Sequence, residues 1–130
     1  MGDFSLTTFS SKGKLLQIEY ALNAVSKGDT ALGIKASNGV VIAVEKKMSS
    51  ILIEEEAYHK ITNICTHVGA VYAGLGPDFR VLIQSARKYN QEYYMKFREP
   101  IQVSSLCRET AQIVQEFTQS GECYGYSVFY

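Results

Sequence analysis

The chain changes from a strand-like to a helix-like pattern at Pro77, and this change constrains its fold more than any other feature. Before it, Thr30–Lys35 and Val40–Lys46 are short β-prone runs, and the Asn-Gly pair at 38–39 between them is a strong hairpin signal. Residues 61–75 have the pattern of a second strand pair. The sequence therefore predicts a meander of antiparallel strands, forming a first sheet, ahead of the long helices.

Two helical patterns follow the strands. Pro77 fits the first turn of a helix with Asp78 beside it, and this helix is expected to end at Pro100. Its apolar stripe consists of Leu82, Ala86, Tyr89, Tyr93 and Phe97. Ser104 and Ser105 are predicted to cap a second helix that stops at Gly121. Its inward positions are Leu106, Thr110, Ile113 or Val114, and Phe117. Strands followed by two helices predict an α+β fold with both helices on one side of a sheet.

Another amphipathic helix is predicted near the start of the chain. Its apolar residues recur at spacings of three and four, at Leu15, Ile18, Leu22 and Val25. Ser10, Ser11 and Gly13 supply the turn before it, and the Gly-Asp pair at 28–29 ends it. We therefore divide the chain into a tail and turn, residues 1–12, and one domain, residues 13–130.

The segment 5–21, SLTTFSSKGKLLQIEYA, resembles the N-terminal signature of the proteasome alpha-type subunits. The residues that match the signature are Phe9, Ser10, Gly13, Lys14, Gln17, Ile18, Glu19, Tyr20 and Ala21. The lead-in SLTTFS is similar to that of the alpha-2 subtype, and Ser11 stands where the family has proline. Further similar stretches are 33–47, 59–61, 71–82 and 116–121.

The resemblance implies the Ntn-hydrolase-type αββα sandwich, of which this chain covers roughly the first half: an N-terminal helix, strands of the first sheet and two packed helices. It also implies a noncatalytic structural and gating subunit of the seven-membered alpha ring of the 20S proteasome core, supporting ubiquitin-dependent protein breakdown. The implied partners are other alpha subunits, beta subunits, regulatory or activator particles, and unfolded polypeptide in transit. No metal or organic cofactor is implied.

Three groups of site residues follow from the same resemblance. The gate turn consists of Phe9, Ser10, Ser11 and Gly13. The helix used for ring contact or packing contributes Leu15, Gln17, Ile18, Glu19, Tyr20, Leu22 and Val25. Lys60 is expected to receive the C-terminal carboxylate of an activator, in a pocket lined by Gly74 and Leu75. A lysine suits this role because its ammonium is a compact charge with three donors. The alternative is a solvated Lys60 paired with a glutamate at 54–56.

Catalysis is a second functional class, because the sister beta subunits of this fold cut peptides with an N-terminal threonine whose own amine assists the hydroxyl. The equivalent position falls near Asp29, with Thr30 next to it, while Glu45 and Lys60 fall near the supporting carboxylate and lysine. The signature helix directly precedes Asp29, so a free amino terminus would require processing to expose Thr30. We therefore expect no enzyme activity and no catalytic residue in this chain.

A third class is a shortened alpha-like product that ends at Tyr130 and binds alpha-type neighbours or assembly chaperones without completing a ring. A sandwich without its second half would leave apolar sheet surface uncovered. We expect such a chain to be poorly soluble or oligomeric on its own.

Composition excludes several other classes of protein. Thirteen basic and thirteen acidic residues leave no net charge, which argues against binding nucleic acid or anionic membranes. No apolar run approaches the roughly 18 residues of a transmembrane helix, and residues 1–10 lack signal-peptide features, so we expect a cytoplasmic and nuclear location. The cysteines, Cys65, Cys107 and Cys123, form neither a disulfide framework nor a CxxC pair. Cys65 and His67 are predicted to share a strand face in a structural role, without the second ligand pair that a metal site needs.

Overall fold

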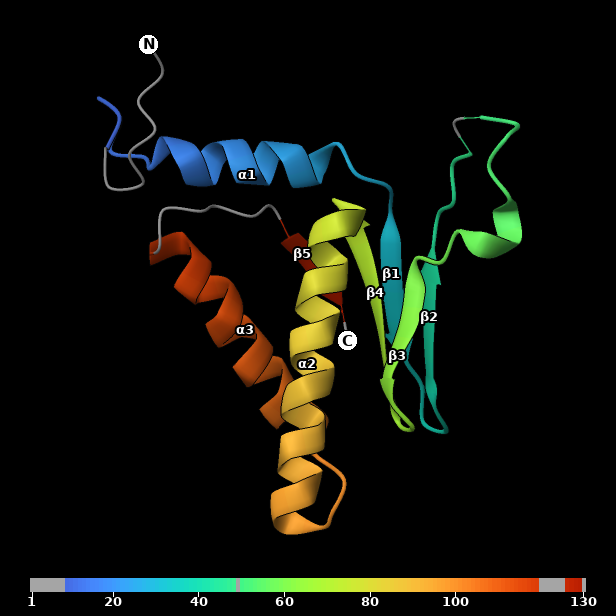
Figure 1. Ribbon diagram of the computed structural model, residues 1–130. Helices are drawn as coiled ribbons and strands as arrows, with labels where there is room; N and C mark the ends of the chain where they lie inside the picture. The colour runs from blue at the N-terminus through green and yellow to red at the C-terminus, as the bar shows by residue number, and fades with distance from the viewer. Residues whose placement is uncertain (1–8, 49, 120–125, 130) are drawn as a thin grey trace.

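The computed structural model describes residues 9–48, 50–119 and 126–129, which form α1, β1, β2, η1, β3, β4, α2, α3 and β5 in chain order (Figure 1). The helices are α1 (Leu16–Ser26), α2 (Gly76–Phe97) and α3 (Val103–Gln119), with a short 3-10 turn η1 (Glu55–Ala57). The strands are β1 (Ala31–Lys35), β2 (Val40–Val44), β3 (Ile61–Cys65), β4 (Val68–Gly74) and β5 (Tyr126–Phe129). The predicted α+β class is confirmed. Predictions that concern residues 1–8 or 120–125, including Cys123, lie outside the described residues.

The strands form two sheets, not the single meander that the sequence predicts. β1 and β2 make an antiparallel hairpin, closed by a hydrogen bond from the Ala36 N–H to the Gly39 carbonyl. β3, β4 and β5 make a second antiparallel sheet with β4 in its centre. Periodicity identifies strand residues but not which strand edges are hydrogen-bonded, so this separation could not be read from the pattern.

β4 lies between the β1–β2 hairpin and the helices. Its side chains alternate between two faces, so that one face packs against the helices and the other against the hairpin. Val68, Ala70 and Tyr72 belong to the core cluster that also contains residues of α2 and α3. On the other face, a Cβ placed on Gly69 would lie 3.6 Å from a methyl carbon of Ile42 in β2. The described chain thus has three layers: α2 with α3, the three-stranded sheet, and the hairpin (Figure 1).

The helix α2 follows its predicted apolar stripe only in part. Leu82 and Ala86 are buried as predicted, and Tyr89 and Tyr93 are half-buried against the core. The prediction is wrong for Phe97, which is 51% exposed near the end of the helix. Pro77 lies in the first turn of the helix. The buried side chains of the helix are Phe79, Leu82, Ile83 and Ala86. The helix ends at Arg98, whose φ of 58° is left-handed and whose N–H bonds to the Tyr94 carbonyl at 2.8 Å, two residues before Pro100.

The predicted cap of α3 is wrong. The helix begins at Val103, so Ser104 and Ser105 lie inside it and do not cap it. The Gln102 carbonyl accepts the N–H groups of both Ser105 and Leu106. Ile101 and Leu106 are 2% and 0% exposed, so tertiary packing on either side of Val103 determines where α3 begins.

No helix within the described ranges is long and apolar enough to cross a bilayer.

Candidate functional site

Lys60 is almost fully buried, with 4% of its surface exposed, immediately before β3. Its Nζ contacts the Oδ2 atom of Asp29 and donates a hydrogen bond to the Glu45 carbonyl at 2.9 Å. The Lys60 ammonium also lies 5.7 Å from the centre of the Tyr58 ring. The alternative of a solvated lysine paired with a glutamate at 54–56 is therefore wrong. Lys60 is buried, and its ammonium is paired with the carboxylate of Asp29, which lies between α1 and β1.

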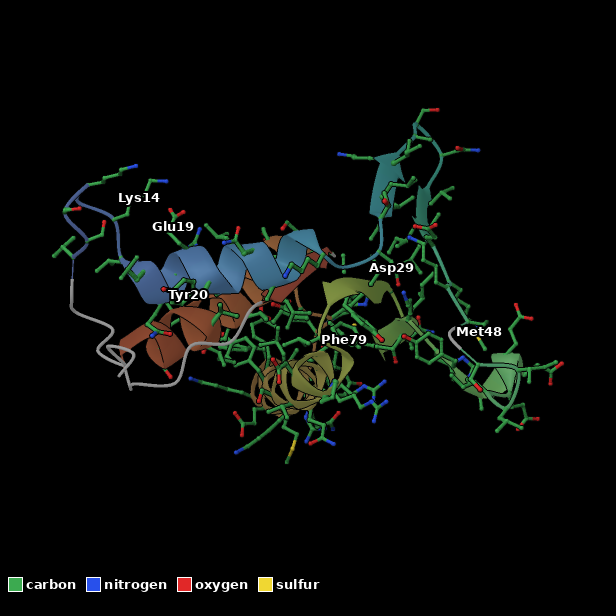
Figure 2. The ribbon with its side chains drawn as sticks, turned by 90° about the horizontal axis from the view of Figure 1, so that it is seen from above. Lys14, Glu19, Tyr20, Asp29, Met48 and Phe79 are labelled. Carbon is green, nitrogen blue, oxygen red and sulfur yellow. The ribbon has the colours of Figure 1, made fainter. Side chains whose placement is uncertain are left out.

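Asp29 connects Lys60 to a more exposed group of charges. Figure 2 shows Asp29 on the segment that joins α1 to β1. Its Oδ1 atom lies 3.6 Å from the Nζ of Lys47, which in turn lies 3.2 Å from the Oε2 of Glu45. The hydrogen bond from Lys60 holds the pKa of Asp29 below its ordinary value. The pKa of Lys47 is raised, chiefly by Glu45. The ion pair between Lys60 and Asp29 is therefore the main electrostatic interaction of this site. The exposed Lys47 contributes little to its stability, because water screens an exposed ion pair.

Gly74 and Leu75 lie near this cluster but do not line the cavity beside Lys60. Gly74 ends β4 with a φ of 132°, and Leu75, which is 52% exposed, is the N-cap residue of α2. The Gly74 backbone abuts Gly28, the residue before Asp29. The cavity next to Lys60 has a volume of about 250 Å³, and its described lining consists of Val44, Lys46, His59, Lys60 and Ile61. The structure thus places Gly74 against the Asp29 segment and gives the Lys60 cavity a different lining.

The predicted gate turn forms a closed backbone loop ahead of α1. The Ser10 N–H bonds to the Lys14 carbonyl at 2.8 Å, and the Lys14 N–H bonds to the Ser10 hydroxyl at 3.1 Å. Gly13 has a φ of 74°, which glycine adopts at little cost, and its N–H bonds to the Ser10 carbonyl at 2.8 Å. Phe9 and Leu15 form an antiparallel bridge across the loop. Ser11 is exposed in the turn, so the loop closes with serine at the position where the family has proline.

The predicted stripe of α1, expected to serve ring contact or packing, is only partly covered within the described chain. Leu15 precedes the helix as its N-cap, in an extended conformation. Ile18 and Leu22 are 37% and 59% exposed, whereas Val25 is half-buried. No residue of α1 is fully buried. The main contacts of the helix with strands are those with β4 and β5. The exposure of Ile18 and Leu22 shows that part of its apolar face is not covered by the described chain.

The polar side of α1 carries the remaining predicted contact residues. Lys14 and Glu19 lie beside each other near the start of the helix, with Nζ and Oε1 3.1 Å apart (Figure 2). Tyr20 is 58% exposed, and Gln17 is half-buried. Of the predicted contact residues on this side, Tyr20 is therefore the one that exposes most of its side chain.

Sequence reasoning missed the partner of Lys60. The sequence indicates Asp29 only as the position equivalent to a nucleophile, and it lies 31 residues from Lys60 in the chain. The signal available in the sequence was that Asp29 and Lys60 fall near the positions of the nucleophile and the supporting lysine of the catalytic relatives, which act together in catalysis. A second missed group surrounds a cavity of about 340 Å³ between η1 and α2, where Tyr58, Tyr72, Arg80 and Arg87 are among the lining residues.

Comparison with known families assigns the class of protein. The family model described as "Proteasome subunit" matches residues 25–129, and the model for the N-terminal signature of A-type proteasome subunits matches residues 3–24. The chain therefore belongs to the proteasome subunit family and carries the alpha-type signature. The three layers of the described chain agree with the first half of the expected Ntn-hydrolase-type αββα sandwich.

Within this family the chain is alpha-2-like. It is 58% identical over 125 residues to the alpha type-2 proteasome subunit of Oryza sativa subsp. indica, in an alignment that covers 93% of this chain and 53% of the relative. It is 55% identical over 118 residues to the alpha type-2 protein from Drosophila melanogaster, and 56% identical over 118 residues to that from Dictyostelium discoideum. Each of these two alignments covers 91% of this chain and 50% of the relative. The chain spans about half the length of the curated relatives that it matches.

Proposed function

We propose that this chain acts as a noncatalytic subunit of the alpha ring of the 20S proteasome core, in the cytoplasm and nucleus, and supports ubiquitin-dependent protein breakdown through assembly and gating. The observation that carries the proposal is the ion pair between Lys60 and Asp29. In this proposal, the position of the nucleophile in the catalytic relatives falls near Asp29, with Thr30 next to it. The charge of the Asp29 carboxylate there is neutralised by the lysine.

The backbone gives a second reason to propose a noncatalytic role. A threonine protease of this type needs a free amine on its nucleophilic residue. Thr30 continues the chain from α1, and its carbonyl accepts the Glu45 N–H at 2.9 Å. An intact-mass measurement tests the point directly. A mass that starts at Met1 or Gly2 supports the proposal, whereas a mature chain that starts at Thr30 would show a processed enzyme.

Ring contact is proposed to use the uncovered part of α1. Ile18, Tyr20 and Leu22 expose apolar surface there, and solvated apolar surface favours association with a neighbouring chain. The closed turn at residues 9–15 would direct the tail, residues 1–8, toward the pore, where it would restrict entry of substrate. Beta subunits and unfolded polypeptide in transit complete the proposed set of partners.

Activator docking is proposed for Lys60. Its ammonium has three N–H donors, of which the contacts to Asp29 and the Glu45 carbonyl use two. The C-terminal carboxylate of an activator tail could approach the third from the cavity of about 250 Å³ that Lys60 lines. The buried position makes such a contact stronger than one on an open surface, because less water competes for the ammonium.

The docking proposal is tested in assembled particles that contain Lys60→Ala, with Lys47→Ala as the matched control. Both lysines contact Asp29, but the side chain of Lys47 is 67% exposed and that of Lys60 only 4%. Native gels should show normal ring assembly for both variants and weaker activator binding for Lys60→Ala alone. Unchanged activator binding by Lys60→Ala particles would refute the docking role while leaving the ring-subunit role in place.

A second candidate function is an interaction protein that binds alpha-type neighbours or assembly chaperones without completing a ring. The observation that favours it is the exposed apolar surface of the β1–β2 hairpin, where Leu32, Ile34 and Val41 are 48%, 59% and 61% exposed. Complexes smaller than a full ring, formed in the presence of all other alpha subunits, would support this function. A cooperative melt from a monodisperse monomer would argue against the expected self-association of the isolated chain.

A further inference from the structure

Cys65 and His67 form a hydrogen-bonded pair at the tip of the β3–β4 hairpin. The Sγ of Cys65 lies 3.5 Å from the Nδ1 of His67, and the Nε2 of His67 lies 2.8 Å from the carbonyl oxygen of Ile101. Cys65 is the last residue of β3, whereas His67 lies in the turn that follows. The prediction that both lie on one strand face is therefore wrong, and the turn brings the ring back over the thiol.

The contact with Ile101 fixes the tautomer of the imidazole. A carbonyl oxygen only accepts hydrogen bonds, so the Nε2 atom must carry the proton in that contact. In the neutral ring the lone pair then lies on Nδ1, the atom that faces Cys65. The thiol can donate its proton to this lone pair. A nucleophile, a base and a group that orients the base are thus arranged in sequence, as nucleophilic catalysis by cysteine requires.

The fold holds these groups in place from two sides. The register of β3 and β4 shifts between Asn63 and Cys65, and the intervening Ile64 is buried in the core. Such a bulge changes the direction in which the next side chain points. On the other side, Ile101 is only 2% exposed, so its carbonyl is a fixed acceptor for the imidazole. The pair is therefore built from a strand end and the connection between α2 and α3.

The pair opens onto a cavity that a small molecule can enter. The cavity has a volume of about 410 Å³, and its lining includes Cys65, His67, Asn90, Gln91, Tyr94 and Pro100. This volume lies in the range typical of small-molecule sites. Among the described residues that line it, only His67 is basic and none is acidic. The amide side chains from α2 can hydrogen-bond to peptide-like groups of a ligand.

We propose that Cys65 and His67 form a thiol-modification site that reacts with low-molecular-weight disulfides of peptide-like chemistry. The proton of the Cys65 thiol moves to Nδ1 of His67, and the thiolate attacks one sulfur of the disulfide. A new S–S bond forms to Cys65 as the S–S bond of the small molecule breaks. The departing thiolate takes the proton back from Nδ1 and leaves as a free thiol. Cys65 and one half of the disulfide remain joined, and no further oxidant is needed.

Cys107 provides an internal comparison. It is half-buried in α3, and burial raises the pKa of its thiol. A thiol with a raised pKa has less thiolate at neutral pH, so Cys107 should react slowly. The two described cysteines thus differ in environment: Cys65 contacts His67, whereas burial raises the pKa of the Cys107 thiol.

The test uses the full chain with Cys107→Ser and Cys123→Ser, which leaves Cys65 as its one thiol. Oxidised glutathione is the probe, and intact-mass spectrometry follows formation of the mixed disulfide at pH 7.4. His67→Gln keeps an N–H donor for the Ile101 carbonyl but has no base, and His59→Gln is the matched control because His59 is the other histidine of the chain. A positioned base contributes a factor of about 100 or more in favourable cases, so we expect His67→Gln to slow the reaction at least tenfold.

The same experiment separates reactivity from folding. His59→Gln should react within about twofold of the parent, and a rate for folded His67→Gln within about twofold of the parent would overturn the proposal. If His67→Gln unfolds, the parent decides the question, because its rate can be compared in buffer and in guanidinium chloride. A native rate at least tenfold above that of the unfolded chain supports the site, and an equal or lower native rate overturns it.

Discussion

Gly28 and Gly74 approach so closely that a Cβ on Gly28 would lie 2.7 Å from the Gly74 amide nitrogen. This contact joins the end of α1 to the end of β4, two segments that are far apart in the sequence. Asp29 follows Gly28 directly, so the contact also sets the position of the carboxylate that pairs with Lys60. The packing of two glycines is therefore part of the candidate site, although neither residue carries a functional group.

We expect Gly28→Ala to destabilise the chain by about 1 to 3 kcal/mol, because the added methyl group meets backbone atoms that cannot rotate away. A Cβ there would also lie 3.0 Å from the Val25 carbonyl oxygen. Gly33→Ala is the matched control, since a Cβ on Gly33 meets no atom within 4 Å. Urea denaturation of both variants measures the difference. Equal stability of the two variants would show that the segments separate without cost.

Removing either member of the Lys60 and Asp29 pair should have unequal effects. Asp29→Asn keeps an oxygen that can accept a hydrogen bond but removes the negative charge that neutralises the Lys60 ammonium, which is only 4% exposed. Lys60→Met removes the buried charge and leaves Asp29, 23% exposed, with Lys47 beside it. We expect losses of about 2 to 3 kcal/mol for Asp29→Asn and about 1 kcal/mol for Lys60→Met. Urea denaturation at pH 7 checks the order, and a larger loss for Lys60→Met would contradict the argument.

The same pair predicts a loss of stability in acid. The pKa of Asp29 is lowered from its ordinary 3.8 chiefly by the hydrogen bond from Lys60. A lowered pKa in the folded state stabilises the protein above the ordinary value, and this contribution is lost as the pH falls through the folded pKa. The parent should therefore melt at a higher temperature than Asp29→Asn at pH 6, and this difference in melting temperature should be smaller at pH 3. A constant difference in melting temperature across this range would mean that the pKa of Asp29 is the same in the folded and unfolded states.

Tyr72 predicts a complementary loss of stability in alkali. Burial, with a smaller contribution from a hydrogen bond with Tyr58, raises the pKa of Tyr72 from 10.0 to about 12. A raised pKa stabilises the folded state below the ordinary value, and this contribution of about 2 to 3 kcal/mol is lost between pH 10 and 12. Tyr72→Phe has no proton to lose, so its melting temperature should fall less over this interval. Parallel declines of the parent and Tyr72→Phe would contradict the prediction.

Local signals predicted the parts of the fold that depend on neighbours in the sequence. Pro77 and the apolar stripe after it define α2, and the buried Leu82 and Ala86 confirm the predicted face. The Asn-Gly pair at 38–39 correctly marks the β1–β2 hairpin. In each case residues a few positions apart determine the structure, so the sequence pattern contains the necessary information.

Relationships between distant segments could not be predicted in the same way. The contact of Asp29 with Lys60 depends on how α1 and β3 are placed by β4, and no local pattern encodes that placement. The exposure of Leu22 has a similar origin, because a stripe at helical spacing shows which residues share a face but not whether a partner covers it. The hydrogen bond between His67 and Ile101 likewise required the connection between α2 and α3 to be located in space.

The exposed face of α1 gives the sharpest test of the proposed ring contact. Leu22 is 59% exposed, so Leu22→Asp should change the stability of the isolated chain by no more than about 0.5 kcal/mol. If a neighbouring subunit buries this side chain, the same change removes about 1.5 to 3 kcal/mol of apolar burial and adds the cost of burying a charge. We therefore expect Leu22→Asp to lower incorporation into alpha rings at least tenfold.

The matched control is Asn23→Asp, which introduces the same charge at the adjacent exposed position. Both variants are assembled with the other alpha subunits, and native gels measure their incorporation while thermal melts measure their folding. Normal melting of both variants, together with loss of Leu22→Asp alone from the rings, would assign the uncovered face of α1 to a subunit contact. Equal incorporation of the two variants would exclude Leu22 from that contact, because a buried interface cannot accept a carboxylate in place of leucine without a measurable loss of affinity.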